Sequence, residues 1–456
     1  AGGTLLLDRM TAAAMARLFG PIPWTWDART RAWRTDAIHY AAVRQALDAG
    51  RWQVVDQVAG WKPVRWSPKQ ACTLRPDQQQ AAAAWRASRR GVIVMPTGTG
   101  KTEVALAIMR AAAVSTLVVA PVRDLMYQWH RRIQDALGYD AGIIGDRLFR
   151  VRPVAVTTYD SACIHMERLG NQFGLIVFDE CHHLPGPVRR DAARMSAAPM
   201  RLGLTATPLR CDGRHTDLDW LIGPTVYEMP MAAARGEVLA DYDVIRIPIH
   251  LSPAEQARYD LLTRQVRSYV AALRRSGAAN TWKDVCAAAA GDPAARRALA
   301  AYRASRSMED RAQEKLRVLE DLFRLHYGSR MIVFAGSNAM ARDVSRRFLI
   351  PCLLNHCRKD ERQEILRGLE GGRYPAVVAN RVLDEGVDLP EAKVAVVIGG
   401  LSSTRQAIQR LGRILRRSGE ARAVLYEVVC AETNDERISR RRRKSDAYQG
   451  TRHCKV

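Results

Sequence analysis

The stretch GVIVMPTGTGKT, residues 91–102, decides the fold of this chain. Its apolar run at 92–95 is typical of a buried parallel strand, and the run ends at Pro96. Gly98 and Gly100 then let the backbone N–H groups of a loop turn toward one anion, and a helix is expected to begin directly afterwards. This succession of strand, loop and helix predicts a phosphate-binding loop within an α/β domain.

The residues in and before this loop have separate predicted roles. Lys101 places a positive charge at the β- and γ-phosphates of ATP, and the Thr102 hydroxyl is a ligand for Mg²⁺. On the preceding helix, the Gln78 amide can both donate to and accept from the edge of adenine. Met95 replaces the first glycine of the G-x-x-x-x-G-K-[ST] pattern, so a fortuitous glycine-rich turn is the alternative at this point. The expected ATP contacts in this region are Arg75, Gln78, Thr97, Gly98, Thr99, Gly100, Lys101 and Thr102.

The composition indicates a protein of two or three domains with a polyanionic partner. A chain of 456 residues exceeds the size of one hydrophobic core. Lys and Arg number 70 against 47 Asp and Glu, and the net charge of +23 favours nucleic acid, with a merely basic surface as the alternative. The nine cysteines contain no C-x-x-C pair, which disfavours a disulfide framework or a zinc ribbon. Without an apolar run of ~18 residues, the expected location is cytoplasmic, nucleoid-associated if prokaryotic, with no membrane contact.

Alternating strands and helices continue after the loop and predict a doubly wound parallel sheet. The strand candidates are 116–120, 154–157, 175–178 and 201–204. Active-site loops of such a sheet lie at the carboxyl ends of its strands. In one of them, FDECHH, Asp179 is expected in the Mg²⁺ shell and Glu180 is expected to polarise the attacking water. In another, GLTATP, Thr205 and Thr207 are placed to link the nucleotide site to the rest of the protein.

A second α/β set begins near residue 331, without a phosphate loop of its own. Its strand candidates are 331–334, 376–379, 394–398 and 423–429. Gly386 and Asp388 follow a strand in VLDEGVDLPEA, where they are expected to meet the ribose of ATP or relay closure. Arg413 and Arg416 are three apart on one helix and share a face, as two cations aimed at a γ-phosphate must. A solvated basic helix is the alternative.

The remaining segments complete the expected organisation of the chain. Six of the ten tryptophans precede residue 70, either to stack on bases or to build the core of a small domain. Trp282 lies in an Ala- and Arg-rich helical stretch. The expected parts are an N-terminal domain at 1–70, a first lobe at 71–235, a linker and helical thumb-like region at 236–325, a second lobe at 326–435 and a basic tail at 436–456.

The order of the motifs resembles that of superfamily 2 helicases, and in particular their XPB branch. The motifs are MPTGTGKT, APVRDLMYQW, DECHH, GLTATP, MIVFAG, VLDEGVDLP and QRLGRILR. The resemblance implies two RecA-like lobes, a small N-terminal damage-recognition-like domain and a helical thumb-like insertion. It also implies ATP- and Mg²⁺-dependent translocation along DNA and opening of the duplex, 3′ to 5′, in repair or transcription.

The resemblance also implies roles for single residues. Gln78 matches the adenine reader, and His182 matches the histidine that couples ATP to DNA, together with Thr205 and Thr207. The implied catalytic residues are Glu180, Lys101 and the arginine fingers Arg413 and Arg416, whose motif opens at Gln409. The expected DNA contacts are Arg123, Thr158, Arg210, Asp212 and Trp282.

One departure from the XPB pattern bears on strand separation. The branch shows Arg-Glu-Asp after its third motif, whereas this chain has Arg210, Cys211 and Asp212. The alternatives to a helicase are therefore a duplex translocase that does not separate strands, and an ATP-gated DNA clamp that recruits a nuclease. The expected partners are duplex, forked or single-stranded DNA and a Bax1-like nuclease, RNA is not excluded by charge, and a monomer is the default.

Overall fold

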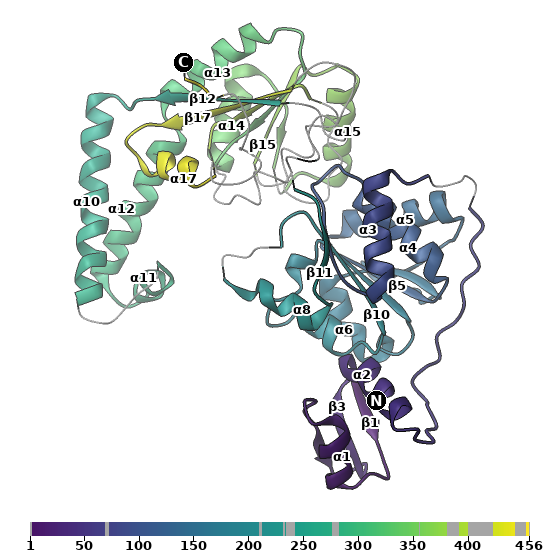
Figure 1. Cartoon of the computed structure of the whole chain (residues 1–456). Coiled ribbons are helices and arrows are strands. Elements are labelled where there is room, and N and C mark those ends of the chain that lie inside the picture. The colour runs from purple at the N-terminus through teal and green to yellow at the C-terminus, as the bar shows by residue number, and fades with distance from the viewer. Residues whose placement is uncertain are drawn as a thin grey trace. The chain divides into compact units, whose positions relative to one another are not determined.

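The computed structural model describes residues 2–68, 73–208, 212–230, 233, 242–275, 282–354, 356–380, 392–399, 423–442 and 453–455. The chain divides near residue 234 into two compact units, each described here by itself (Figure 1). The first unit contains an N-terminal domain and a large mixed sheet, and the second contains another large sheet with a helical insertion. Across the ranges given above, no helix combines the length and hydropathy that crossing a bilayer demands.

The N-terminal domain is a small antiparallel sheet covered by two helices. Strands β1 (Thr4–Leu7), β3 (Ala32–Asp36) and β2 (Thr25–Asp27) pair in that order, and helices α1 (Ala12–Phe19) and α2 (Tyr40–Ala49) pack beside them. Trp24, Trp33 and Trp61 pack against its core, whereas Trp26 and Trp52 are 48% and 41% exposed. The expectation of a tryptophan-built core is therefore confirmed for the first three, and base stacking by the exposed two stays a prediction.

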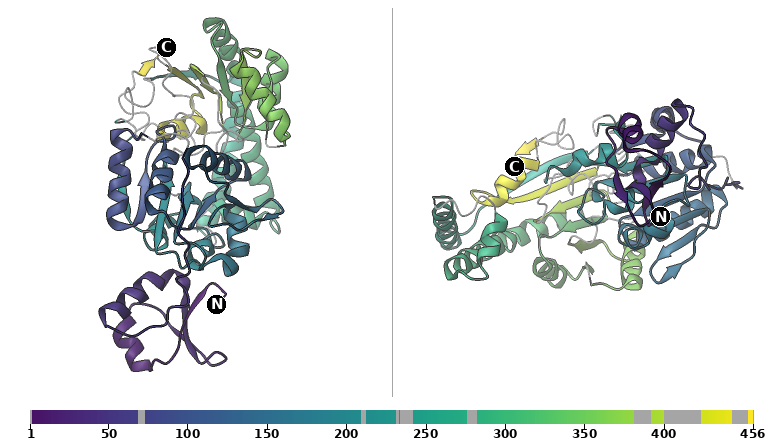
Figure 2. Two further views of the ribbon diagram at one scale, coloured as in Figure 1. Left: turned by 90° about the vertical axis from the view of Figure 1, so that its right-hand side faces the viewer. Right: turned by 90° about the horizontal axis from the view of Figure 1, so that it is seen from below.

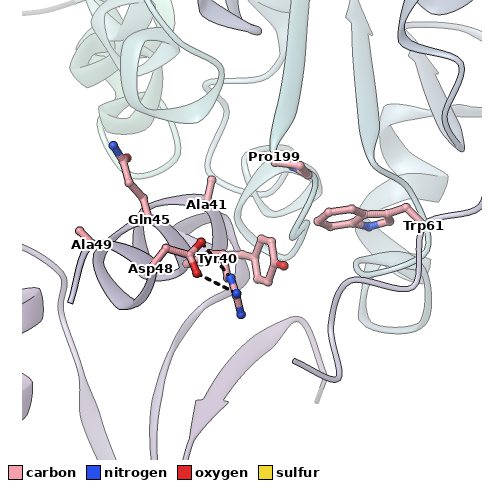
Figure 3. Close-up of a pocket in the computed structure, with 8 residues that line it drawn as sticks. Tyr40, Ala41, Gln45, Asp48, Ala49, Trp61 and Pro199 are labelled. Atoms are coloured by element: carbon pink, nitrogen blue, oxygen red, sulfur yellow. Dashed lines mark hydrogen bonds and ion pairs between the residues drawn. The ribbon is translucent and has the colours of Figure 1, made fainter. Parts of the chain in front are cut away.

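Polar and aromatic contacts attach the N-terminal domain to the first lobe, and Figure 2 shows the domain at one end of this unit. The Arg194 guanidinium lies 2.8 Å from the Asp36 carboxylate. Residues of the N-terminal domain and Pro199 of the first lobe also line an open hollow of about 570 Å³ (Figure 3). It is lined by Tyr40, Ala41, Arg44, Gln45, Asp48, Ala49, Trp61 and Pro199. The charges of Arg44 and Asp48 are paired with each other at 2.7 Å, so the hollow presents a balanced surface.

The first lobe is built on an eight-stranded sheet in the order β11-β4-β10-β9-β5-β8-β6-β7. The strands are β4 (Arg90–Val94), β5 (Thr116–Ala120), β6 (Gly142–Gly145), β7 (Leu148–Phe149), β8 (Val154–Thr158), β9 (Leu175–Asp179), β10 (Met200–Thr205) and β11 (Thr225–Glu228). The longer helices are α3 (Pro76–Ser88), α4 (Lys101–Ala112), α5 (Arg123–Leu137) and α6 (Tyr159–Leu169), with short α7 (Asp191–Arg194) and α8 (Asp217–Leu221). The central strands are parallel and apolar on both faces, as expected for a sheet with helices on each side.

The second unit contains a seven-stranded parallel sheet in the order β14-β15-β13-β16-β17-β12-β18. Its strands are β12 (Tyr242–Ile249), β13 (Met331–Phe334), β14 (Cys352–Leu353), β15 (Ala376–Ala379), β16 (Val394–Val397), β17 (Ala423–Cys430) and β18 (His453–Lys455). Helices α13 (Gln313–Leu325), α14 (Asn338–Phe348), α15 (Lys359–Glu370) and α17 (Asn434–Arg442) accompany it. The fold class predicted from the sequence, two α/β lobes with a small N-terminal domain and a helical insertion, is confirmed.

The insertion is shorter than the interval 236–325 in which the sequence places it. Strand β12 lies in that interval but pairs with β17, and α13 contributes Leu316, Leu319 and Leu322 to the core of the second lobe. The insertion itself consists of α10 (Pro253–Arg275), α11 (Trp282–Ala288) and α12 (Pro293–Asp310). Likewise, β18 and all but the first two residues of α17 lie in the segment expected as a basic tail.

Hydrogen bonds fix the base of the insertion to the second lobe. The Tyr259 hydroxyl of α10 donates to Glu309 of α12 at 2.6 Å, and the Asn434 backbone N–H donates to the same carboxylate at 3.0 Å. Nearby, the buried Lys315 ammonium lies 2.9 Å from Asp435. Because these charged and polar groups are buried, removing one partner would leave the other without compensation.

Candidate nucleotide site

Three neighbouring strands bring the predicted nucleotide motifs to one edge of the first sheet. Strand β10 lies between β4 and β9, with Thr205 beside Val94 and Leu204 beside Asp179. The Met95 backbone N–H continues this pairing by donating to the Thr205 carbonyl at 3.0 Å. The loops that follow the three strands therefore start next to one another, at the carboxyl ends where ligands of such sheets bind.

The loop after β4 has the backbone conformation that an anion-binding loop requires. Gly98 and Gly100 have φ values of 89° and 85°, in the left-handed region that side chains disfavour. A Cβ atom on Gly100 would lie 2.4 Å from the Gln78 Nε2 atom. The Thr99 hydroxyl donates to the Pro96 carbonyl at 2.7 Å and closes the turn before α4. Glycine is therefore needed at position 100 for both conformation and space.

The loop holds a buried cation and a hydroxyl at the N-terminus of α4. The Lys101 ammonium donates to the carbonyl oxygens of Met95 and Pro96 at 3.1 and 3.4 Å, and the residue is 9% exposed. The Thr97 Oγ1 atom is buried with no hydrogen-bond partner within the described ranges. A buried ammonium, an unsatisfied hydroxyl and a helix N-terminus together fit a polyphosphate chain.

Gln78 is fixed to the phosphate loop. Its Oε1 atom accepts from the Arg75 backbone N–H at 3.0 Å, and its Nε2 atom donates to the Thr99 carbonyl at 3.1 Å. Arg75 itself donates to the Thr99 carbonyl at 2.5 Å and pairs with Asp77 at 2.9 Å. An amide can donate two hydrogen bonds and accept two, so this arrangement leaves one of each kind for a base. Adenine recognition by Gln78 stays a prediction.

Asp179, the last residue of β9, and Glu180, the next residue, are both buried, and the ionised form of Asp179 is disfavoured there. Asp179 Oδ2 accepts from the Trp129 indole N–H at 2.8 Å, and Oδ1 accepts from the Glu180 backbone N–H at 3.0 Å. Burial, and next the neighbouring charge of Glu180, raise the pKa of Asp179, while Trp129 and then Lys101 act in the opposite direction. A divalent cation would remove this penalty by pairing with both carboxylates, so the residues fit a metal such as Mg²⁺.

His182 connects the acidic pair with the loop after β10. Its Nδ1 atom lies 3.4 Å from Glu180 Oε2 and 3.0 Å from the Thr205 hydroxyl. The Thr205 oxygen also accepts from the Thr207 backbone N–H at 3.1 Å. A continuous chain of polar contacts thus runs from Glu180 to Thr207. The coupling role that the sequence assigns to His182, Thr205 and Thr207 stays a prediction.

The other predicted site residues lie in several places. Arg123 pairs with Asp146 at 2.8 Å, and Thr158 caps α6 by accepting from the Ser161 N–H at 3.3 Å. Asp212 accepts from the Arg214 N–H, and Trp282, in the second unit, contacts the Tyr302 ring with centroids 4.3 Å apart. The predicted residues Arg210, Gly386, Asp388, Gln409, Arg413 and Arg416 lie outside the described residues.

Two aromatic residues of the site escaped the sequence analysis. Trp129 contacts the Asp179 carboxylate, and the buried Tyr159 hydroxyl donates to the Asp179 backbone carbonyl at 3.0 Å. Both residues follow a strand of the first lobe, and Trp129 ends the motif APVRDLMYQW. From the sequence alone, Trp129 is indistinguishable from an ordinary core residue, because its hydrogen-bond partner Asp179 is fifty positions away in the chain.

Comparison with known proteins agrees with this arrangement. Residues 1–58 match the family described as xeroderma pigmentosum group B helicase damage recognition domain. Residues 71–210 match type III restriction enzyme, res subunit, and residues 314–418 match helicase conserved C-terminal domain. The chain is also similar to the solved helicase domain of Hef from Pyrococcus furiosus, with a TM-score of 0.55 over 80% of this chain and 98% of that one. At 18% identity this likeness shows the fold alone.

Two curated relatives are more similar to this chain in sequence than that structure is. DNA 3′-5′ helicase XPB of Kineococcus radiotolerans is 30% identical over 395 residues, which cover 83% of this chain and 63% of that protein. DNA 3′-5′ translocase XPB2 of Sulfurisphaera tokodaii is 39% identical over 421 residues, which cover 92% of this chain and 95% of that protein. Because the second alignment is nearly end to end, this chain belongs to the XPB family of superfamily 2 helicases.

Proposed function

We propose that this protein hydrolyses Mg²⁺-ATP to move 3′ to 5′ along DNA and to open the duplex. The observation that carries the proposal is the contact chain in which the phosphate loop, the acids at the end of β9 and the threonines at the end of β10 adjoin one another. The direction and the DNA substrate come from the names of the two XPB relatives, a 3′-5′ translocase and a 3′-5′ helicase.

The residues of the first lobe have complementary tasks in this proposal. Mg²⁺, when bound, neutralises the charge of the β- and γ-phosphates. Thr102 and Asp179 would hold it, and Lys101 would turn from the loop carbonyls toward the phosphates. Glu180 would accept a hydrogen bond from the attacking water, while His182 keeps its carboxylate oriented.

The second lobe is proposed to complete the site. Arg413 and Arg416 would reach the γ-phosphate as arginine fingers when the lobes close, with Gln409 in the same motif. Gly386 and Asp388 would meet the ribose. Because hydrolysis then requires closure, DNA that favours closure would accelerate turnover. A Bax1-like nuclease is the proposed protein partner, and the chain is proposed to act as a monomer in the cytoplasm, associated with the nucleoid if the organism is prokaryotic.

A duplex translocase that leaves the strands paired is the second candidate. Cys211 stands where the XPB pattern has a glutamate beside Arg210 and Asp212. The relative that is aligned nearly end to end is also named a translocase rather than a helicase. Strand displacement, measured beside triplex disruption on the same duplex, separates the two candidates.

The first test is steady-state ATP hydrolysis without nucleic acid and with single-stranded DNA, duplex, forked duplex and RNA at one salt concentration. Salt must be fixed, because phosphate contacts make affinity strongly salt-dependent. Strong stimulation by DNA over RNA is the expected result. Hydrolysis that no polymer changes would contradict a DNA-gated motor and would favour the ATP-gated clamp.

A further inference from the structure

Helix α5 touches the candidate nucleotide site and also carries Arg123, a residue predicted to contact DNA. Met126, Trp129, Ile133 and Leu137 form its buried stripe, with exposed fractions from 0% to 2%. This apolar stripe packs against strands β5, β6 and β8 of the sheet. Trp129 of this stripe, and side chains outside it, contact three separate parts of the first lobe.

The middle of α5 contacts the carboxylate of Asp179, which is proposed to hold Mg²⁺. The Trp129 indole N–H donates to Asp179 Oδ2 at 2.8 Å, and both residues are buried. In this setting the hydrogen bond fixes the orientation of the carboxylate, since water has little access to replace it. Any displacement of α5 along its axis would therefore move or release the group proposed to hold Mg²⁺.

The C-terminal half of α5 contacts the helix of the phosphate loop. Arg132 forms an ion pair with Glu103, which lies in the first turn of α4 next to Thr102. The two helices also pack against each other (Figure 1). Of the two proposed Mg²⁺ ligands of the first lobe, Asp179 is thus contacted by α5 directly, and Thr102 is next in sequence to a residue that α5 contacts.

The N-terminal end of α5 contacts a hairpin at the edge of the sheet. Arg123 and Tyr127 donate to the two oxygens of Asp146 at 2.8 and 2.9 Å. Asp146 and Arg147 form the turn between β6 and β7, with φ values of 51° and 65°. The Arg123 side chain remains 69% exposed, and it lies about 9 Å along the helix axis from Trp129 at 1.5 Å per residue.

We propose that α5 couples DNA binding to the metal site, with Trp129 as a positioning residue for Asp179. A phosphate bound at Arg123 would shift the helix end, and Trp129 and Arg132 would transmit the shift to Asp179 and α4. This route is separate from the one through His182 and Thr205, and it rests on the proposed function, in which DNA stimulates hydrolysis.

The test is the Trp129→Phe variant, which keeps an aromatic ring but removes the indole N–H. Trp85→Phe is the matched control, because the Trp85 N–H donates to the Arg201 carbonyl at the same 2.8 Å and that side chain is also 2% exposed. The first readout is the ratio of ATP hydrolysis with saturating forked DNA to hydrolysis without DNA. The second is DNA affinity, measured by fluorescence anisotropy with and without a non-hydrolysable ATP analogue and Mg²⁺.

Trp129→Phe is expected to lower the stimulation ratio by at least about 5-fold, the smaller end of typical coupling between two sites. It should also bring the DNA affinities with and without the analogue together, since coupling is reciprocal. DNA affinity without nucleotide should stay that of the wild type. Trp85→Phe should leave the ratio unchanged.

Arg132→Gln is the second variant, and it protects the test against a folding failure because this ion pair lies at the surface. It should lower the same ratio in the same direction. Wild-type ratios in both Trp129→Phe and Arg132→Gln, or an equal loss in Trp85→Phe, would overturn the proposal. If the wild-type protein itself shows no stimulation by DNA, the proposed function fails and the role of α5 in coupling fails with it.

Discussion

The two lobes each place a helix directly after a buried strand, but the two helix N-termini differ in what they can bind. Before α4, Gly100 adopts a left-handed conformation, and no described side chain caps the first turn. Before α14, the Ser337 side chain accepts from the Met340 N–H at 3.1 Å, and its hydroxyl donates to Asp310. A helix N-terminus can receive an anion only where its own chain leaves the N–H groups available. The one carboxylate in the first turn of α4, Glu103, is paired with Arg132.

Of the substitutions that test this difference between the two helix N-termini, Lys101→Ala is expected to have the largest effect, on ATP hydrolysis. The substitution removes the buried ammonium of the phosphate loop, and ATP hydrolysis should fall by at least about 10²–10³-fold, as for other groups that stabilise transition-state charge. DNA affinity should stay within a few-fold of the wild type, which an anisotropy titration checks. Normal turnover in this variant would show that the loop before α4 is not the phosphate site.

Gly100→Ala tests the conformation of the same loop. The new Cβ would meet Gln78 at 2.4 Å at a φ of 85°, and strain of this kind costs about 1–3 kcal/mol. The substitution should therefore lower both the free energy of unfolding and the affinity for nucleotide. Chemical denaturation measures the first, and binding of a fluorescent ATP analogue measures the second. Gly372→Ala is the control, because its φ is 75° but its Cβ would meet nothing within 4 Å. Equal effects of the two substitutions on nucleotide affinity would contradict a special role for Gly100.

Ser337→Ala tests the helix that is capped by its own chain. Loss of the cap should lower the free energy of unfolding by about 1 kcal/mol. Nucleotide affinity should not change, because the N–H groups of α14 are not used for phosphate. A weaker affinity for ATP, after correction for the folded fraction, would mean that the second helix N-terminus also contributes to the nucleotide site.

Asp310→Asn should have the smallest effect, and its sign depends on pH. Burial raises the pKa of Asp310, so the ionised carboxyl destabilises the folded state above its folded pKa. The variant should therefore be more stable than the wild type at pH 7. The difference should vanish below about pH 4, where the carboxyl is protonated in both states. Denaturation at several pH values measures it, and a gain that grows toward acid would contradict this assignment.

The sequence predicted the strands best where burial is complete. All nine strand candidates, including the run at 92–95, are present, with ends that differ by two residues or fewer, because parallel strands covered on both faces are continuous apolar runs. Strand β12 was missed, since Arg246 and Pro248 interrupt its apolar pattern and it lies at the side of the sheet, next to β18. Strands β7 and β14 have two residues each, too few for a periodic signal. Strand β6 has a glycine at each end, and β11 has no buried residue.

The candidate site was predictable where its residues are contiguous in the sequence. The phosphate loop and the Asp179–Glu180 pair each lie within one motif, and the structure brings them together as expected from the strand order. The contacts of Gln78 with the loop and of Trp129 with Asp179 join residues that are far apart in the chain. Such contacts depend on how helices pack on the sheet, which a pattern in one segment does not contain.

The helical insertion begins after β12 and ends before α13, and both of these elements belong to the second lobe. Its polar attachments, Tyr259 with Glu309, lie at the start of α10 and the end of α12, whereas α11 lies at the far end (Figure 1). The insertion is therefore a module. Its length can change during evolution, or be shortened by design, without altering the register of any strand in the sheet that carries it.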